Sequence, residues 1–134
     1  MKPIHDPITE AIIQCILRVH RVLGPGFLEC IYRRALLTEL RKAGLRAESE
    51  KEIPVLYEGE LVGLHRLDLL VEHQVIVELK TVDRLAKIHY AQIRSYLKAT
   101  GLRVGLLVNF ATELADFRRV EQIQGPVPFS PPIP

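Results

Sequence analysis

Two short apolar segments joined by only three residues constrain the fold of this chain more than any other feature. Residues 66–71 (RLDLLV) and 75–80 (VIVELK) alternate in polarity around Glu72, His73 and Gln74. In an antiparallel pair joined by this loop, residue 71 lies opposite 75 and residue 68 lies opposite 78, and opposed residues share a face. One face is then wholly apolar, with Leu67, Leu69, Val71, Val75, Val77 and Leu79. A shift of one residue would lose this face, so the pattern predicts the register although the loop lacks glycine.

The opposite face of the predicted hairpin gathers charged side chains. It carries Asp68, Glu78 and Lys80, with Arg66 beside them. Two carboxylates on adjacent strands can share a hard divalent cation such as Mg²⁺ or Mn²⁺, and a nearby lysine can orient or deprotonate a water molecule. This chemistry would hydrolyse a phosphodiester. The alternative is an exposed strand face with cross-strand ion pairs.

The remaining patterns predict an α/β domain. Apolar residues three and four apart indicate helices over 7–23, 28–43 and 84–99. Alternating or continuous apolar runs indicate strands over 48–57, 61–71, 75–81 and 103–110. The first helix stops at Gly24-Pro25-Gly26, because proline cannot continue it. The order is therefore helix, helix, three strands, helix and strand.

The length of 134 residues suits a single domain, which we expect over 1–121, followed by an irregular proline-rich tail over 122–134. The sequence has neither a membrane-length apolar run nor a signal-peptide pattern at its start, so we expect a cytoplasmic protein without a membrane partner. Cys15 and Cys30 are too few for a structural zinc site, and we expect both to be reduced and packed among apolar neighbours. The net charge of +2 neither requires nor excludes a polyanionic partner.

Two motifs resemble those of a known enzyme group. Asp68 followed by Glu78-Leu79-Lys80 resembles the PD-(D/E)XK nuclease signature, with Leu67 in place of the proline. Upstream, Gly26, Glu29 and Tyr32 match the GxxExxY motif of a family of small bacterial and archaeal proteins assigned to that superfamily. The preceding Leu23-Gly-Pro-Gly26 and the later Asn109-Phe110 are also similar to that family, and the resemblance extends to about Arg119.

The resemblance implies a restriction-endonuclease-like fold, an αβββαβ core in which helices flank a mixed sheet. It also implies that Asp68 and Glu78 are metal ligands and that Lys80 is the catalytic lysine. Glu29 corresponds to the glutamate that the first core helix supplies to the metal and its water. Tyr32 lies three residues from Glu29 and therefore on the same helical face, so we expect both to point at one cleft. The alternative is that Glu29 only stabilises its helix, because a negative charge is favourable near a helix N-terminus.

The helix predicted after Lys80 offers further candidates. Gln92 and Tyr96, with His89, share one helical face, and Gln92–Tyr96 resembles the QxxxY element of RecB-type members. This resemblance implies that Gln92 hydrogen-bonds near the phosphate or the strand backbone and that Tyr96 supports the site; the alternative is ordinary packing against the sheet. The role of His65 stays open. A separate stripe of this helix could meet phosphates or simply face solvent, and consists of Arg84, Lys87, Arg94 and Lys98.

The sequence therefore favours a metal-dependent nuclease, with Mg²⁺ or Mn²⁺ as cofactor and nucleic acid, DNA rather than RNA, as substrate. Because a domain of this size offers little surface for gripping a duplex, we expect a homodimer or a protein partner. The alternative hypothesis is a catalytically silent nucleic-acid-binding or protein-interaction module with the same fold. A third is a metal-dependent hydrolase of a smaller phosphate ester.

Overall fold

A computed structural model describes residues 6–122 and shows three helices and one five-stranded sheet within them. The helices are α1 (Pro7–Leu23), α2 (Glu29–Lys42) and α3 (Lys87–Thr100). The strands are β1 (Ala47–Tyr57), β2 (Glu60–Val71), β3 (Val75–Lys80), β4 (Val104–Asn109) and β5 (Asp116–Glu121). The expected tail lies outside the described residues except for Gln122, whose side-chain amide donates to the Leu97 and Leu102 carbonyls.

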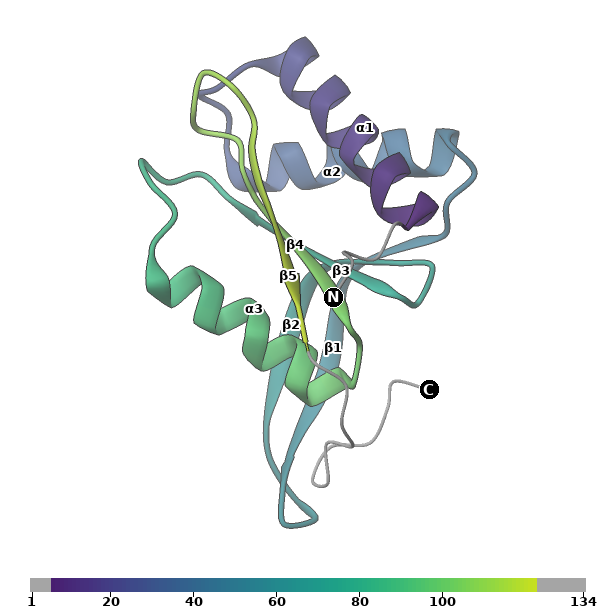
Figure 1. Ribbon diagram of the computed structural model, residues 1–134, viewed down its shortest axis with the longest axis vertical. Helices are drawn as coiled ribbons and strands as arrows, with labels where there is room; N and C mark the ends of the chain where they lie inside the picture. Colours follow the sequence, from purple (N-terminus) through teal and green to yellow (C-terminus); the bar gives the residue numbers. More distant parts are fainter. Residues whose placement is uncertain (1–5, 123–134) are drawn as a thin grey trace.

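The sheet is mixed, with strands in the order β1-β2-β3-β4-β5. β3 and β4 are parallel and joined through α3, whereas the other neighbours are antiparallel. One apolar core lies between the sheet and the pair α1 and α2, and a second lies between the sheet and α3 (Figure 1). The predicted α/β architecture with helices flanking a mixed sheet is confirmed.

The structure adds one strand that the sequence patterns did not predict. β5 pairs with β4 from Val104–Glu121 to Asn109–Asp116 and forms one edge of the sheet. Its sequence, DFRRVE, is mostly charged, and Val120 is its only buried residue. The strand therefore depends on backbone pairing with β4 rather than on an apolar face, which is why it has no clear alternation.

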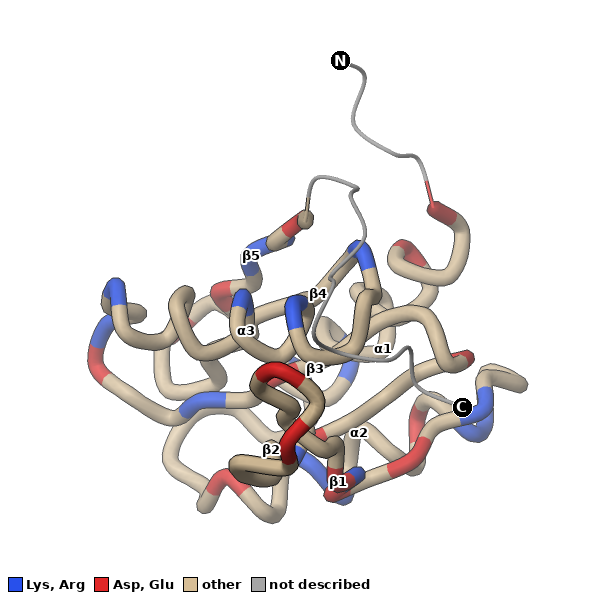
Figure 2. Tube along the Cα trace, turned by 90° about the horizontal axis from the view of Figure 1, so that it is seen from below, with Lys and Arg blue, Asp and Glu red and all other residues tan. Residues whose placement is uncertain are grey.

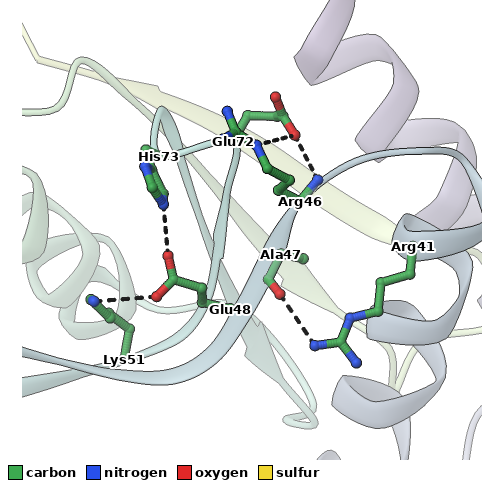
Figure 3. A network of polar contacts seen from close by, with 7 residues as sticks. All are labelled: Arg41, Arg46, Ala47, Glu48, Lys51, Glu72 and His73. Carbon is green, nitrogen blue, oxygen red and sulfur yellow. Dashed lines mark hydrogen bonds and ion pairs between the residues drawn. The ribbon is translucent and has the colours of Figure 1, made fainter.

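The β2–β3 turn gives the hairpin its predicted register. Val71 lies opposite Val75 and Leu69 opposite Val77. In place of glycine, Glu72 and His73 take left-handed backbone angles, with φ of 53° and 54°. The Glu72 carboxylate accepts a hydrogen bond of 2.6 Å from the Arg46 amide and contacts the Arg46 guanidinium (Figure 3). His73 contacts the Glu48 carboxylate at 2.9 Å, so contacts to the start of β1 hold this turn in place.

The predicted apolar face of the hairpin is correct except for one residue. Leu69, Val71, Val75, Val77 and Leu79 belong to the core beneath α1 and α2. Leu67 instead belongs to the core beneath α3, so the prediction was wrong for this residue. The change occurs next to Asp68, where β2 and β3 stop pairing in a regular ladder.

The close approach of α3 to the sheet requires a glycine on β4. A Cβ atom added to Gly105 would lie 2.7 Å from Ile93 Cδ1, closer than normal contacts allow. Ile93 is fully buried and sits on α3 one residue after Gln92. Gly105 therefore allows α3 to lie close enough to the sheet for its side chains to meet the end of β3.

The β1–β2 hairpin extends beyond the helices (Figure 1). Large apolar side chains are exposed on this extension, namely Tyr57, Leu61, Val62 and Leu64. No helix within residues 6–122 is long and apolar enough to cross a membrane.

Candidate active site

The two predicted carboxylates meet where the β2–β3 ladder is interrupted. Beyond the Leu69–Val77 pair, the Leu79 amide donates a hydrogen bond of 2.8 Å to Asp68 Oδ2 instead of to a backbone carbonyl. The Asp68 amide in turn donates to Glu78 Oε1 over 3.4 Å. Each carboxylate thus contacts the backbone of the neighbouring strand, so the hairpin register brings the two side chains together.

Burial makes this pair electrostatically unusual. Glu78 is 4% exposed. Desolvation, followed by the negative charge of Asp68, raises the pKa of Glu78 to about 8. Desolvation also raises the pKa of Asp68, and the Leu79 hydrogen bond partly opposes that change. Because burial raises the pKa of both carboxyl groups, the two can be ionised at the same time only if a positive charge lies nearby.

Lys80 supplies part of that charge. Its ammonium lies 3.8 Å from Glu78 Oε2 and lowers the pKa of both Glu78 and Asp68. It also donates a hydrogen bond of 2.7 Å to Gln92 Oε1 on α3. The Lys80 side chain is 16% exposed, so these two partners determine where its ammonium lies. The structure thus places Gln92 beside the lysine.

Tyr96 lies on the same side of α3 as Gln92 and is buried. Burial, together with the charges of Glu78 and Asp68, raises the pKa of Tyr96 to about 12, so its hydroxyl stays protonated. The His65 ring packs edge-on against the Tyr96 ring at 4.6 Å between centroids. Burial lowers the pKa of His65, which therefore favours the neutral form. His89 is at the start of α3, where its Nδ1 accepts from the Ala86 amide.

Glu29 reaches this cluster from the first residue of α2. Desolvation raises its pKa, and the charge of Asp68 raises it further, whereas Lys80 and Arg33 lower it. These interactions place the Glu29 carboxylate within electrostatic range of the β2 and β3 residues. The described part of the chain therefore brings Glu29, Asp68, Glu78 and Lys80 into one neighbourhood.

Tyr32 does not face that neighbourhood, contrary to the expectation from helical spacing. It is fully buried and stacks on Phe110, with 4.5 Å between ring centroids. Its hydroxyl donates to the Gly24 carbonyl over 2.5 Å and accepts from the Phe27 amide. Tyr32 therefore fixes the corner that leads into α2, and it acts on the position of Glu29 through the backbone.

A family comparison agrees with this geometry. The model of the PD-(D/E)XK nuclease superfamily matches residues 6–120. The chain belongs to this superfamily. The crystal structure of SSO0001 resembles this member of the superfamily in fold, with a TM-score of 0.55 and 14% identity over 90% of this chain and 80% of that one. A search of curated proteins gives no match.

The superfamily implies a divalent metal, and the donor set fits one. Asp68 and Glu78 offer hard oxygen ligands in a desolvated site, where a cation would stabilise both ionised carboxylates. Glu29 is a third oxygen donor nearby. Among residues 6–122, no three His, Cys, Asp or Glu side chains are already grouped closely enough to hold an ion.

Two residues beside the candidate site were given no role in it by the sequence patterns. Arg33 follows Glu29 by one helical turn, and its charge lowers the pKa of both Glu29 and Asp68. Asn109 is fully buried beside Lys80 in the β3–β4 register. Its side chain bonds to both backbone groups of Val82 and thereby holds the segment that follows Lys80. The helical spacing of Arg33 and the Asn109-Phe110 resemblance were the available signals.

The predicted basic stripe is exposed, but only Lys87, Arg94 and Lys98 lie on α3, because the helix begins at Lys87 and Arg84 precedes it. Part of the stripe borders a cavity. Arg94 and Lys98 line this cavity of about 610 Å³ together with His65, while Asp68 and Glu78 do not line it. Acidic and basic positions are interspersed along the rest of the described chain rather than separated into two faces (Figure 2).

Proposed function

We propose that this protein is a metal-dependent nuclease that hydrolyses phosphodiester bonds, as its superfamily suggests. One observation carries the proposal: Asp68 and Glu78 contact each other's strands, and Lys80 lies 3.8 Å from Glu78. A structural ion pair would need one carboxylate for one ammonium. Here two buried carboxyl groups, Asp68 and Glu78, share one ammonium, and this surplus of negative charge suits the binding of a cation.

In this proposal Asp68 and Glu78 hold Mg²⁺ or Mn²⁺, with Glu29 as a further ligand or as a partner of water. When bound, the ion would stabilise negative charge on the phosphate and favour loss of a proton from water. Lys80 orients that water through its ammonium, which Gln92 holds in place. Tyr96 keeps its hydroxyl proton and can donate to an oxygen near the carboxylates.

For the substrate we propose nucleic acid, with DNA favoured over RNA, and membership of the GxxExxY family. The exposed apolar side chains of the β1–β2 hairpin support a second copy or a protein partner that completes the substrate-binding surface. Cys15 is buried as expected, whereas Cys30 is exposed on α2. Their free thiols support a reducing compartment such as the cytoplasm.

Cleavage of labelled single- and double-stranded DNA and RNA tests the proposal. The native chain is assayed with Mg²⁺ and with Mn²⁺ beside Lys80→Ala and Asp68→Asn, since asparagine retains an oxygen that can accept the Leu79 hydrogen bond. Lys42→Ala is the matched control, because Lys42 is exposed at the end of α2. All four proteins are purified identically, and their folding is checked by thermal unfolding.

Metal-dependent cutting that is lost in both site variants and kept in the control supports the nuclease. If the native chain cuts no polymer and calorimetry detects no divalent metal binding, the proposal is wrong and the silent binding module replaces it. Hydrolysis of a nucleotide without cutting of a polymer would instead favour a smaller phosphate ester.

A further inference from the structure

Three charged side chains form a separate group beside the carboxylates. Glu50 Oε1 on β1 lies 3.2 Å from the Arg33 guanidinium and 3.8 Å from that of Arg66. Arg33 comes from α2 and Arg66 from β2, so three different elements meet here. The group is accessible, because the side chains of Glu50 and Arg66 are 46% and 66% exposed.

Each of the three side chains lies next to Asp68 or acts on it. Arg66 precedes Asp68 by two residues on β2, a separation of about 7 Å along a strand. On β1, Ser49 pairs with Leu69 and Lys51 pairs with Leu67, so Glu50 lies between these pairs, at the level of Asp68. Arg33 is one helical turn after Glu29, and its positive charge lowers the pKa of both Glu29 and Asp68. Both guanidinium groups therefore border the proposed catalytic carboxylates.

Fold stability alone does not account for this arrangement. Glu50 has a φ of 53° within β1, a left-handed conformation that is unfavourable for a residue with a side chain. Ion pairs with this degree of exposure contribute little to stability. A strained residue that holds two arginines next to a candidate active site is typical of a site that binds a ligand.

We propose that Arg33 and Arg66 bind a phosphate group of the nucleic-acid strand next to the bond that is cut, and that Glu50 occupies the position of this phosphate in the free protein. The inference rests on the proposed nuclease function and adds a substrate subsite to it. Guanidinium groups bind phosphate oxygens in the same paired geometry in which they bind carboxylates, so a phosphate can replace Glu50. At a rise of about 3.4 Å per nucleotide along a duplex strand, the separation of Arg66 from Asp68 corresponds to about two nucleotides.

The charges of the site explain why a phosphate subsite is needed. Glu29, Asp68 and Glu78 are three acidic groups, and Lys80 is the basic residue among them. Even where Glu78 is protonated, ionised Glu29 and Asp68 outnumber the single charge of Lys80, so further cations beside this cluster would favour the approach of a polyanionic strand. Since basic and acidic positions are interspersed elsewhere in the described chain, two arginines beside the carboxylates would make a large contribution to binding (Figure 2).

Binding measurements on charge variants test the subsite. Fluorescence anisotropy of labelled single- and double-stranded DNA and RNA oligonucleotides is recorded with the full chain in Ca²⁺ at several salt concentrations, and gels confirm that the probes stay intact. The variants are Arg33→Gln, Arg66→Gln and Glu50→Gln. Arg34→Gln and Glu60→Gln are matched controls, because Arg34 is the exposed neighbour of Arg33 on α2 and Glu60 lies at the far end of the β1–β2 hairpin.

For the best-bound probe, Arg33→Gln and Arg66→Gln should each weaken binding and reduce the slope of log K against log salt by about 0.7–0.9. Glu50→Gln should tighten binding several-fold, because the competing carboxylate is removed. Both controls should match the native chain within about twofold. Arg33→Lys, which keeps the charge near Asp68, is included in case Arg33→Gln unfolds, and it should also bind more weakly because lysine lacks the paired geometry.

The subsite is wrong if the arginine variants bind like Arg34→Gln, if Glu50→Gln binds like Glu60→Gln, or if no probe binds the native chain. The nuclease proposal is judged separately from cleavage with Mg²⁺ or Mn²⁺. A native chain that cuts, with arginine variants that bind normally, overturns the subsite alone. Arginine-dependent binding by a chain that neither cuts a polymer nor binds a divalent metal would overturn the nuclease and leave only a strand-binding site at the arginines.

Discussion

The Lys80 ammonium donates a hydrogen bond of 2.7 Å to Gln92 Oε1 and lies 3.8 Å from Glu78 Oε2. The contact joins the end of β3 to α3, the helix whose Ile93 packs against β4 where Gly105 has no side chain. Gln92 therefore acts in this proposal as a positioning residue that works through Lys80.

Gln92→Ala should lower kcat roughly 10- to 100-fold with little change in KM, because the Lys80 ammonium loses one of its two partners. Gln92→Glu should add a negative charge beside Lys80 and Glu78 and move the pH–rate profile to higher pH. Steady-state kinetics over a pH series measure both effects. Gln14→Ala, on the exposed face of α1, is the control. Equal losses in kcat for Gln92→Ala and the control would contradict the positioning role.

Metal binding should release a proton near neutral pH. With the pKa of Glu78 raised to about 8, this carboxyl is mostly protonated at pH 7 in the metal-free chain, and a cation must displace that proton. Calorimetric titration of Mn²⁺ in two buffers of different ionisation enthalpy measures the release. Affinity should rise between about pH 6.5 and 8.5 and then level off. An affinity that is independent of pH across this interval would contradict the assignment of Glu78 as a ligand.

The metal-free chain should lose stability as pH rises. Glu78 has a pKa of about 8 in the fold against 4.5 for the ordinary side chain, so its stabilising contribution is complete below about pH 4.5 and is lost as pH rises towards 8. Glu78→Gln removes this penalty and should raise the unfolding midpoint at pH 8 by roughly 4 °C or more, with a smaller effect at pH 5. Thermal unfolding in EDTA measures it, with the exposed Glu60→Gln as control. A lower midpoint for Glu78→Gln than for the native chain at pH 8 would refute the prediction.

Tyr32→Phe should destabilise the fold by about 1–3 kcal/mol, because the Gly24 carbonyl and the Phe27 amide both lose the hydroxyl. The stacking on Phe110 is retained, so the change isolates the hydrogen bonds. Urea unfolding measures the loss. Tyr57→Phe, on the exposed part of β1, should have no effect. If the two variants unfold at the same urea concentration, the Tyr32 hydroxyl does not hold the corner.

The sequence predicted those parts of the fold that bury an alternating or periodic apolar face. The β2–β3 register followed from such a face, and it brought Asp68 and Glu78 together as predicted. β5 escaped prediction because its pairing with β4 is made by the backbone, which leaves no pattern in the side chains.

Other features of the site depend on contacts between distant segments. Helical spacing placed Tyr32 on the face of Glu29 but could not show that the Gly24 carbonyl and Phe110 would draw the ring into the core. The left-handed Glu50 and its contact with Arg33 likewise arise where β1 meets α2, and no local pattern of either segment indicates them.

The hydrogen bond from the Leu79 amide to Asp68 gives the site an internal reporter. The amide proton contacts the carboxylate that is proposed to bind the cation, so any change in the charge or orientation of Asp68 alters its surroundings. In an NMR spectrum the Leu79 resonance would therefore respond to occupancy of the site, even for a variant that turns over no substrate. Binding could then be followed at one backbone position, independently of whether the chain cuts anything.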